Sequence, residues 1–177
     1  MLEDIQKINN FLSDEEFSSL ETEVQKFHWK LSGGEFMPEN GTRVFWYKDL
    51  IESTITEKLF KDKVEALLGK SISTHRLYAN GQAHGQCAWP HQDVTDDAGD
   101  GWGSVVFYLH KPWWPHYGGH LIFIDTNNGD PEVYESIFPK TNSAVLFDSR
   151  RWHLGLDPTV YCLSQRISIA YKFKIEG

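Results

Sequence analysis

Three side chains in the second half of the sequence form a pattern that can hold a metal ion. His91 and Asp93 are two residues apart in the segment WPHQD, and residues with this spacing point to the same side of an extended backbone. Such a pair alone is common by chance, and it gains weight from His153, which follows the apolar run Ala144–Phe147 and a polar turn. Two imidazoles and one carboxylate leave adjacent positions open on Fe(II), which suits a bidentate co-substrate plus dioxygen. A closed structural zinc site needs a fourth protein ligand.

A basic side chain follows in the strand-like run RISIAYKF, in which Arg166 and Ser168 share one face. An arginine binds a carboxylate through two parallel hydrogen bonds and stays charged at any working pH. Arg166 is therefore a candidate anchor for the distal carboxylate of a dicarboxylic keto acid whose other end chelates the iron. The alternative is an ordinary ion pair at the end of a strand.

Two helices followed by short strands are expected to position these side chains. Ser13 and Glu16 form a capping-box pattern before a helix from about Asp14 to Phe27, and a second helix is predicted over Ser53 to Leu68, with Gly69 as its terminator. The predicted strands are Val44–Tyr47 (a candidate sheet edge), Ile72–Tyr78, Ser104–His110, His120–Ile124, Ala144–Phe147 and Ile167–Phe173. This order predicts an α+β, mainly β fold, a closed or double-sheet architecture such as a jelly roll, with the helices packed on one outer face.

Length, charge and cysteine content limit the possible functions. A chain of 177 residues suits a single domain over 1–177, with a helical part to about residue 70 and a β core from about residue 71. The net charge of -8 has the wrong sign for a surface that binds phosphates, so nucleic acid is not expected as a partner. The two cysteines lack metal-binding spacing, and neither a signal peptide nor a membrane-spanning stretch is visible. A soluble, cytoplasmic protein without a membrane partner is expected.

The order of these motifs resembles the Fe(II)/2-oxoglutarate oxygenase superfamily, and within it the branch of the prolyl 4-hydroxylases. The resemblance covers most of the chain, from a lead into the first helix to the closing strand. The segments that carry it are INNFLS at 8–13, Tyr78, NGQ at 80–82, HQD at 91–93, VVFYL at 105–109, GGHLIF at 118–123 and the strand 166–173.

The resemblance implies a double-stranded β-helix core, of the jelly-roll or cupin-like kind, and a role for seven side chains. The implied iron ligands are His91, Asp93 and His153. The implied contacts to 2-oxoglutarate are Arg166 as its anchor, Ser168, Tyr108 and Tyr78. Relatives commonly place the basic anchor about ten residues beyond the distal histidine. Arg166 lies thirteen residues beyond His153, so the connecting loop is longer here.

The activity that the resemblance implies is hydroxylation of an unactivated C–H bond with Fe(II), 2-oxoglutarate and dioxygen, releasing succinate and carbon dioxide. No catalytic side chain is expected beyond the metal centre, and the implied substrate is a prolyl peptide or protein, or a related small molecule. Trp113, Trp114 and Tyr117 lie in a loop between two predicted strands and are candidates for substrate recognition, although aromatic residues also simply pack.

Two rival functions use the same core. The acidic charge argues against the first, a nucleic-acid demethylase. The second is a non-redox cupin-like metal- or ligand-binding module. Arg166 with Ser168 separates the oxygenase from this module, because a module without redox chemistry needs no anchor for a keto acid.

Overall fold

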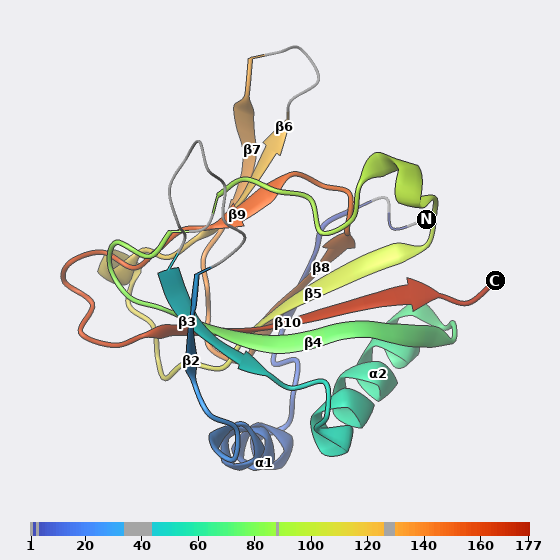
Figure 1. Cartoon of the computed structure of the whole chain (residues 1–177), viewed down its shortest axis with the longest axis horizontal. Coiled ribbons are helices and arrows are strands. Elements are labelled where there is room, and N and C mark those ends of the chain that lie inside the picture. Colours follow the sequence, from blue (N-terminus) through green and yellow to red (C-terminus); the bar gives the residue numbers. More distant parts are fainter. Residues whose placement is uncertain (1, 3, 34–43, 88, 126–129) are drawn as a thin grey trace.

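The strands in the described part of the chain form two antiparallel sheets (Figure 1). The computed structural model describes residues 2, 4–33, 44–87, 89–125 and 130–177. The elements in this part of the chain are β1 Gln6–Asn9, α1 Asp14–Gln25, β2 Lys30–Gly33, β3 Val44–Asp49, α2 Thr54–Leu68, β4 Ile72–Gln82, β5 Trp102–Tyr108, β6 Leu121–Asp125, β7 Glu132–Ile137, β8 Ser143–Asp148, β9 His153–Gly155 and β10 Arg166–Ile175. The larger sheet has the order β1-β8-β5-β10-β4-β3-β2, and the smaller sheet has the order β7-β6-β9.

Strand β10 lies in the middle of the larger sheet, between β5 and β4. The register places Ser168 opposite Tyr108 on one side and Asn80 on the other, and it places Arg166 opposite Gln82. Because side chains alternate along a strand, every second residue of β10 from Arg166 onward faces the same side of the sheet. Three of these residues, Arg166, Ser168 and Ala170, line a cavity that is described below.

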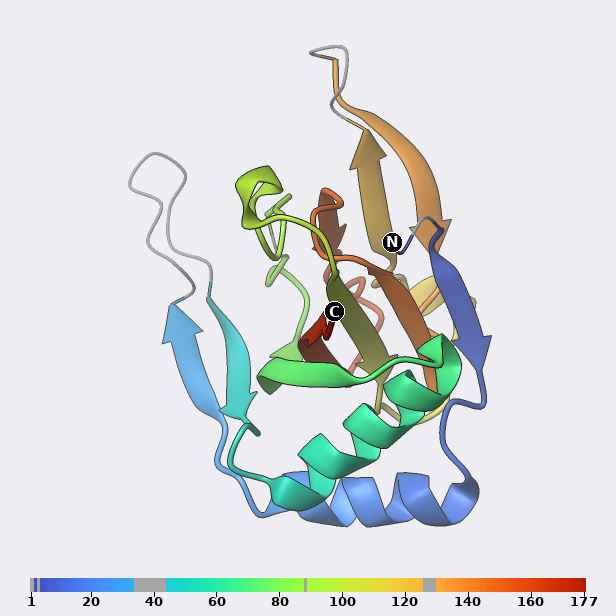
Figure 2. The same cartoon turned by 90° about the vertical axis from the view of Figure 1, so that its right-hand side faces the viewer.

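The two helices cover the other face of the larger sheet (Figure 2). Phe60 and Val64 of α2 belong to the same buried cluster as Leu77 of β4 and as Ile169 and Tyr171 of β10. Each helix has an apolar stripe that water would otherwise contact, so this packing stabilises helices and sheet together. The predicted position of the helices on one outer face is confirmed.

The predicted start of α1 and the predicted end of α2 are confirmed, whereas α1 ends at Gln25 before the predicted Phe27, and Ser53 is the N-cap of α2 rather than its first residue. The Ser13 hydroxyl accepts a hydrogen bond from the Glu16 backbone N–H, and the Glu16 side chain accepts one from the Ser13 N–H, which completes the capping box. Gly69 ends α2 in the left-handed conformation at φ 62°, which glycine adopts without steric cost.

The six predicted strands are present, most of them longer than predicted, and four further strands were not predicted. Those four are β1, β2, β7 and β9. Strands β1, β2 and β9 are short, and β7 is mostly exposed, so their sequences lack the apolar alternation that marks a strand. The prediction that Val44–Tyr47 lies at a sheet edge is wrong, because β2 pairs with the outer side of β3 and is itself the edge. Neither helix of the described residues is long and apolar enough to cross a membrane.

Candidate metal centre and co-substrate pocket

Three side chains from two separate segments converge on one point. A two-way backbone bridge holds two of them together: the His91 N–H donates to the His153 carbonyl at 3.0 Å, and the His153 N–H donates back at 2.9 Å. The Nε2 atoms of His91 and His153 lie 3.5 and 3.8 Å from Oδ1 of Asp93. These potential ligand atoms all lie within 4.8 Å of one another. The structure thus brings together the three residues predicted to bind metal, here called the His-Asp-His cluster.

The backbone sets the tautomer of both imidazoles. Nδ1 of His91 lies 2.9 Å from the Trp89 carbonyl, and Nδ1 of His153 lies 2.8 Å from the Arg151 carbonyl. Because a carbonyl only accepts, each Nδ1 carries the hydrogen and each Nε2 of the neutral ring keeps its lone pair for a ligand. Burial lowers the pKa of His153 to about 4, so this ring is neutral near pH 7, the form that binds a metal.

Asp93 is buried and held by hydrogen bonds and one cation. Its Oδ2 accepts a hydrogen bond from the Ser104 hydroxyl at 2.6 Å, and that hydroxyl lies 2.7 Å from the Ser149 hydroxyl. Its Oδ1 lies 2.5 Å from Nζ of Lys172. Burial alone would raise the pKa of Asp93, but the neighbouring side chains of His91 and His153 and the positive charge of Lys172 outweigh it and hold the pKa below its usual range. The carboxylate is therefore ionised and ready to bind a cation.

Arg166 is the second polar centre of the same cavity and is 2% exposed. Its Nε donates to the Gly119 carbonyl at 2.7 Å, and its Nη1 donates to Oε1 of Gln82 at 2.7 Å. A Cβ at Gly119 would lie 2.9 Å from Cδ of Arg166, so the absence of a side chain there permits this close approach. Among the described residues, the hydrogen bonds of Arg166 involve only Nε and Nη1, which leaves Nη2 for a ligand.

Three further residues predicted to contact the co-substrate lie around Arg166 or in the cavity. Tyr108 is fully buried with its ring 5.1 Å from the Arg166 guanidinium carbon, and its hydroxyl has no hydrogen-bond partner in the described part of the chain. The Ser168 hydroxyl lies 3.4 Å from Nη1 of Arg166. Ser168 and Tyr78 line the cavity, which also reaches Arg166 and the His-Asp-His cluster. A buried hydroxyl without a partner is costly unless a ligand supplies one, so this pocket fits a carboxylate.

The loop that carries Trp113, Trp114 and Tyr117 lies on the Arg166 side of the site, since Trp113 and Arg166 both lie next to Gly119. Trp113 is buried, donates from Nε1 to the Gly118 carbonyl at 2.9 Å, and packs on the His110 ring with centroids 4.2 Å apart. Trp114 is 58% exposed, and Tyr117 contacts the Trp113 ring edge-on. None of the three predicted substrate-contacting residues is among the cavity-lining side chains. The burial of Trp113 favours the packing alternative, while substrate recognition by Trp114 and Tyr117 stays a prediction.

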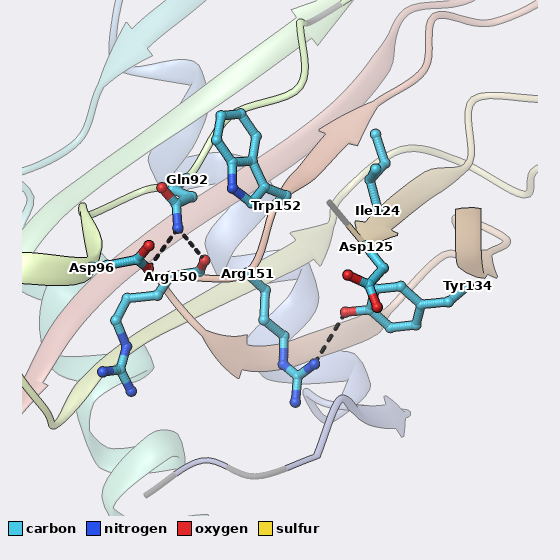
Figure 3. Close-up of a pocket in the computed structure, with 8 residues that line it drawn as sticks. All are labelled: Gln92, Asp96, Ile124, Asp125, Tyr134, Arg150, Arg151 and Trp152. Atoms are coloured by element: carbon cyan, nitrogen blue, oxygen red, sulfur yellow. Dashed lines mark hydrogen bonds between the residues drawn. The ribbon is translucent and has the colours of Figure 1, made fainter. Parts of the chain in front are cut away.

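A second, open cleft of about 350 Å³ is lined by neighbours in the chain of the His-Asp-His cluster, among them Gln92 and Trp152 (Figure 3). Gln92, between His91 and Asp93 in the chain, lines this cleft. Its Nε2 donates to the Arg150 carbonyl at 2.7 Å and to Oδ1 of Asp96 at 2.9 Å. Gln92 therefore ties the segment that carries two members of the cluster to the turn that precedes the third.

Several residues of the site were not predicted. Ser104 and Lys172 contact the Asp93 carboxylate and Gln82 contacts the Arg166 guanidinium, yet no role was predicted for them. Lys172 had a usable signal, because it lies an even number of residues from Arg166 and so shares its face of the strand. Ser104 had none, since its role depends on pairing between distant segments.

Comparison with known families decides the superfamily. The sequence pattern of the 2OG-Fe(II) oxygenase superfamily matches residues 72–174, which is more than half of the chain. The chain belongs to this superfamily. Its cofactors are accordingly Fe(II) and 2-oxoglutarate, with dioxygen as the oxidant. The site fits these groups, because two imidazoles and a carboxylate face one another beside a guanidinium with a free donor. No curated protein matches the sequence.

Solved structures of oxygenases share the fold at low identity. A prolyl hydroxylase from Trichoplax adhaerens, in complex with a peptide fragment of the hypoxia inducible factor, is 18% identical, with a TM-score of 0.69 over 96% of this chain and 83% of that one. A prolyl-4-hydroxylase from Pseudomonas putida is 19% identical, with a TM-score of 0.63 over 98% and 93%. HygX from Streptomyces hygroscopicus, with nickel, 2-oxoglutarate and hygromycin B bound, is 11% identical, with a TM-score of 0.70 over 96% and 82%. The predicted double-stranded β-helix core is confirmed by these likenesses.

Proposed function

We propose that this oxygenase binds iron through His91, Asp93 and His153, anchors 2-oxoglutarate through Arg166, and hydroxylates an unactivated C–H bond of a prolyl peptide. One observation supports the proposal most strongly: a single cavity is lined both by the His-Asp-His cluster and by Arg166 with Ser168. A non-redox metal-binding module of the same fold has no use for a buried guanidinium beside its metal ligands.

The residues of the chain would divide the work as follows. Bound iron, 2-oxoglutarate and dioxygen supply the oxidising chemistry, with succinate and carbon dioxide as products. The His-Asp-His cluster provides three protein ligands and leaves the remaining positions to co-substrate and oxidant. Arg166, fixed by Gly119 and Gln82, orients the distal carboxylate of the co-substrate, and the buried hydroxyls of Tyr108 and Ser168 supply further polar contacts.

The prolyl substrate is supported by the prolyl hydroxylases among the structural neighbours, one of which is described with a peptide bound. A neighbour with hygromycin B bound shows that the same fold accepts small molecules, so a related small substrate is part of the proposal. The net charge of -8 makes a nucleic-acid substrate unfavourable.

The metal and co-substrate assignments are tested by anaerobic titration of the metal-free protein with Fe(II) and then 2-oxoglutarate. A weak visible charge-transfer band should appear in the wild type and in His84→Ala, which changes an exposed histidine outside the cluster, and should be lost in His153→Ala. Iron binding without a band would refute the co-substrate assignment and favour the non-redox module.

The substrate assignment needs a separate measurement. Proline-containing peptides and free proline are incubated with the loaded enzyme, and succinate release is followed together with the mass of the substrate. We expect a gain of one oxygen atom on the peptide, coupled to succinate. Succinate formation that no prolyl compound stimulates would overturn the prolyl assignment while leaving the oxygenase assignment intact.

A further inference from the structure

A buried lysine contacts the carboxylate of the proposed metal centre. Lys172 is 6% exposed, and its Nζ lies 2.5 Å from Oδ1 of Asp93. This Oδ1 is the oxygen that lies 3.5 and 3.8 Å from the Nε2 atoms of His91 and His153. The ammonium group therefore contacts the oxygen that faces the proposed metal position. It does not contact Oδ2, which accepts the hydrogen bond from the Ser104 hydroxyl.

Lys172 is also the cation that balances Asp93. Arg166 lies on the same face of β10 but six residues away, which corresponds to about 20 Å along a strand. Each imidazole of the cluster donates its Nδ1 hydrogen to a backbone carbonyl and not to the carboxylate. Among the described residues, Lys172 is accordingly the permanent positive charge in contact with this buried carboxylate.

A metal ion and Lys172 compete for the same charge. A divalent cation bound to Oδ1 would bring two further positive charges close to a buried ammonium, and charges repel strongly where water is excluded. Without the metal, removal of the ammonium would leave the Asp93 carboxylate buried and supported mainly by a neutral hydroxyl. Loss of Lys172 should therefore affect the metal-free and metal-bound proteins in opposite directions.

We infer that Lys172 is a positioning residue that holds the metal-facing oxygen of Asp93 in the metal-free protein and, by its charge, weakens the affinity of the centre for a divalent metal. The inference rests on the proposed metal centre. It assigns the carboxylate an internal counter-ion that is replaced, wholly or in part, when the metal binds.

The test compares wild type, Lys172→Met and Lys172→Arg, with Mn(II) as a metal probe that is stable in air. Lys172→Met keeps the apolar stem and removes the charge. We expect its metal-free form to unfold at a temperature lower by roughly 10 °C, because a buried ion pair loses one partner. We expect its affinity for Mn(II), measured by calorimetry, to rise by about tenfold or more. Lys172→Arg keeps the charge and should bind Mn(II) nearly as the wild type does.

Lys48 provides a matched control. It is also a buried lysine, 5% exposed, but its Nζ donates to the Val24 carbonyl on the helical side of the sheet. Lys48→Met should lower the unfolding temperature equally with and without Mn(II) and leave the affinity unchanged. If Lys172→Met does not fold, Lys172→Gln provides the same measurement with a shorter neutral side chain.

The outcomes separate this inference from the proposed function. Unchanged or weaker Mn(II) binding by Lys172→Met overturns the role of Lys172, while loss of binding in His153→Ala still supports the metal centre. Mn(II) binding that His153→Ala does not reduce overturns both. A purely structural role for Lys172 predicts that Lys172→Met is less stable and binds the metal equally well or more weakly, whereas the inference predicts tighter binding.

Discussion

His110 is a buried histidine that should make the protein sensitive to acid. It is 3% exposed and lies between Tyr108 and Trp113, with ring centroids 5.7 and 4.2 Å away. Neither ring nitrogen has a hydrogen-bond partner in the described part of the chain. Burial, together with the positive charge of Arg166, lowers the pKa of His110 to about 3 from an ordinary value of 6.5. The folded protein therefore keeps this ring neutral, whereas the unfolded chain takes up a proton below about pH 6.5.

The sign and size of the effect follow from this difference in proton uptake. Since the folded pKa of this base is lowered, His110 destabilises the fold as the pH falls from about 6.5 toward 3, and its effect near pH 7 is small. At pH 5 the cost is about 2 kcal/mol, because pH 5 lies roughly one and a half units below the pKa of the histidine in the unfolded chain, and over this range only the unfolded chain takes up the proton. His110→Phe keeps the stacked ring and removes this cost, so its advantage over the wild type should grow by about 2 kcal/mol between pH 7 and pH 5.

The assay is urea unfolding of metal-free wild type and His110→Phe at both pH values. His75→Phe is the control, because His75 is exposed and its ring also packs on an aromatic side chain, Trp102. The difference between His75→Phe and wild type gives the effect of the same substitution at an exposed position, against which the change at His110 is compared. Equal pH dependence of wild type and His110→Phe would refute the reasoning, since it would mean that the folded protein protonates His110 as readily as the unfolded chain does.

Three further predictions concern the site itself. Gly119→Ala should raise the KM for 2-oxoglutarate about tenfold or more, because the new Cβ would displace the Arg166 side chain. Gly99→Ala should leave the KM unchanged, since Gly99 has a similar positive φ but no atom within 4 Å of the new Cβ. Equal KM values for the two variants in steady-state kinetics would contradict this. Ser104→Ala should weaken Mn(II) binding by about 10- to 100-fold, because the hydroxyl orients the Asp93 carboxylate; calorimetry that shows wild-type affinity would remove Ser104 from the site. Mn(II) at about 100 times its Kd should raise the free energy of unfolding by about 2.7 kcal/mol, and chelation should reverse this in a thermal unfolding scan.

The parts of the fold that depend on local sequence could be predicted. The capping box at Ser13 and the terminator at Gly69 act through neighbours a few residues away, so their patterns are visible in the sequence. The His-x-Asp pair could also be proposed, because two residues share a face whatever strand they pair with. Its partnership with His153 was predicted from the position of His153 after an apolar run and a polar turn, and the structure explains it by the backbone bridge between His91 and His153.

Features that depend on pairing between distant segments could not be predicted. Strand β9 has three residues and is defined by its pairing with β6, so its own sequence carries little signal. The contact of Ser104 with Asp93 likewise requires β5 to lie beside the segment 91–93, which no local pattern states. Trp113 resembled a substrate-binding residue by its position in a loop, but burial against His110 is set by the tertiary fold.

The two buried cations of β10 balance different states of the site. In the metal-free protein the Lys172 ammonium and the Asp93 carboxylate cancel, and Arg166 remains as a buried positive charge without a described acidic partner. An arriving dianionic co-substrate is therefore attracted to Arg166 whether or not metal is present, while a divalent metal must overcome the repulsion of Lys172. Once metal, co-substrate, Asp93 and Arg166 are counted together, their formal charges sum to zero, and Lys172 leaves an excess of one positive charge. A substrate that presents a negatively charged or strongly polar group near the metal centre should consequently bind better than a neutral analogue, and Lys172→Met should remove that preference.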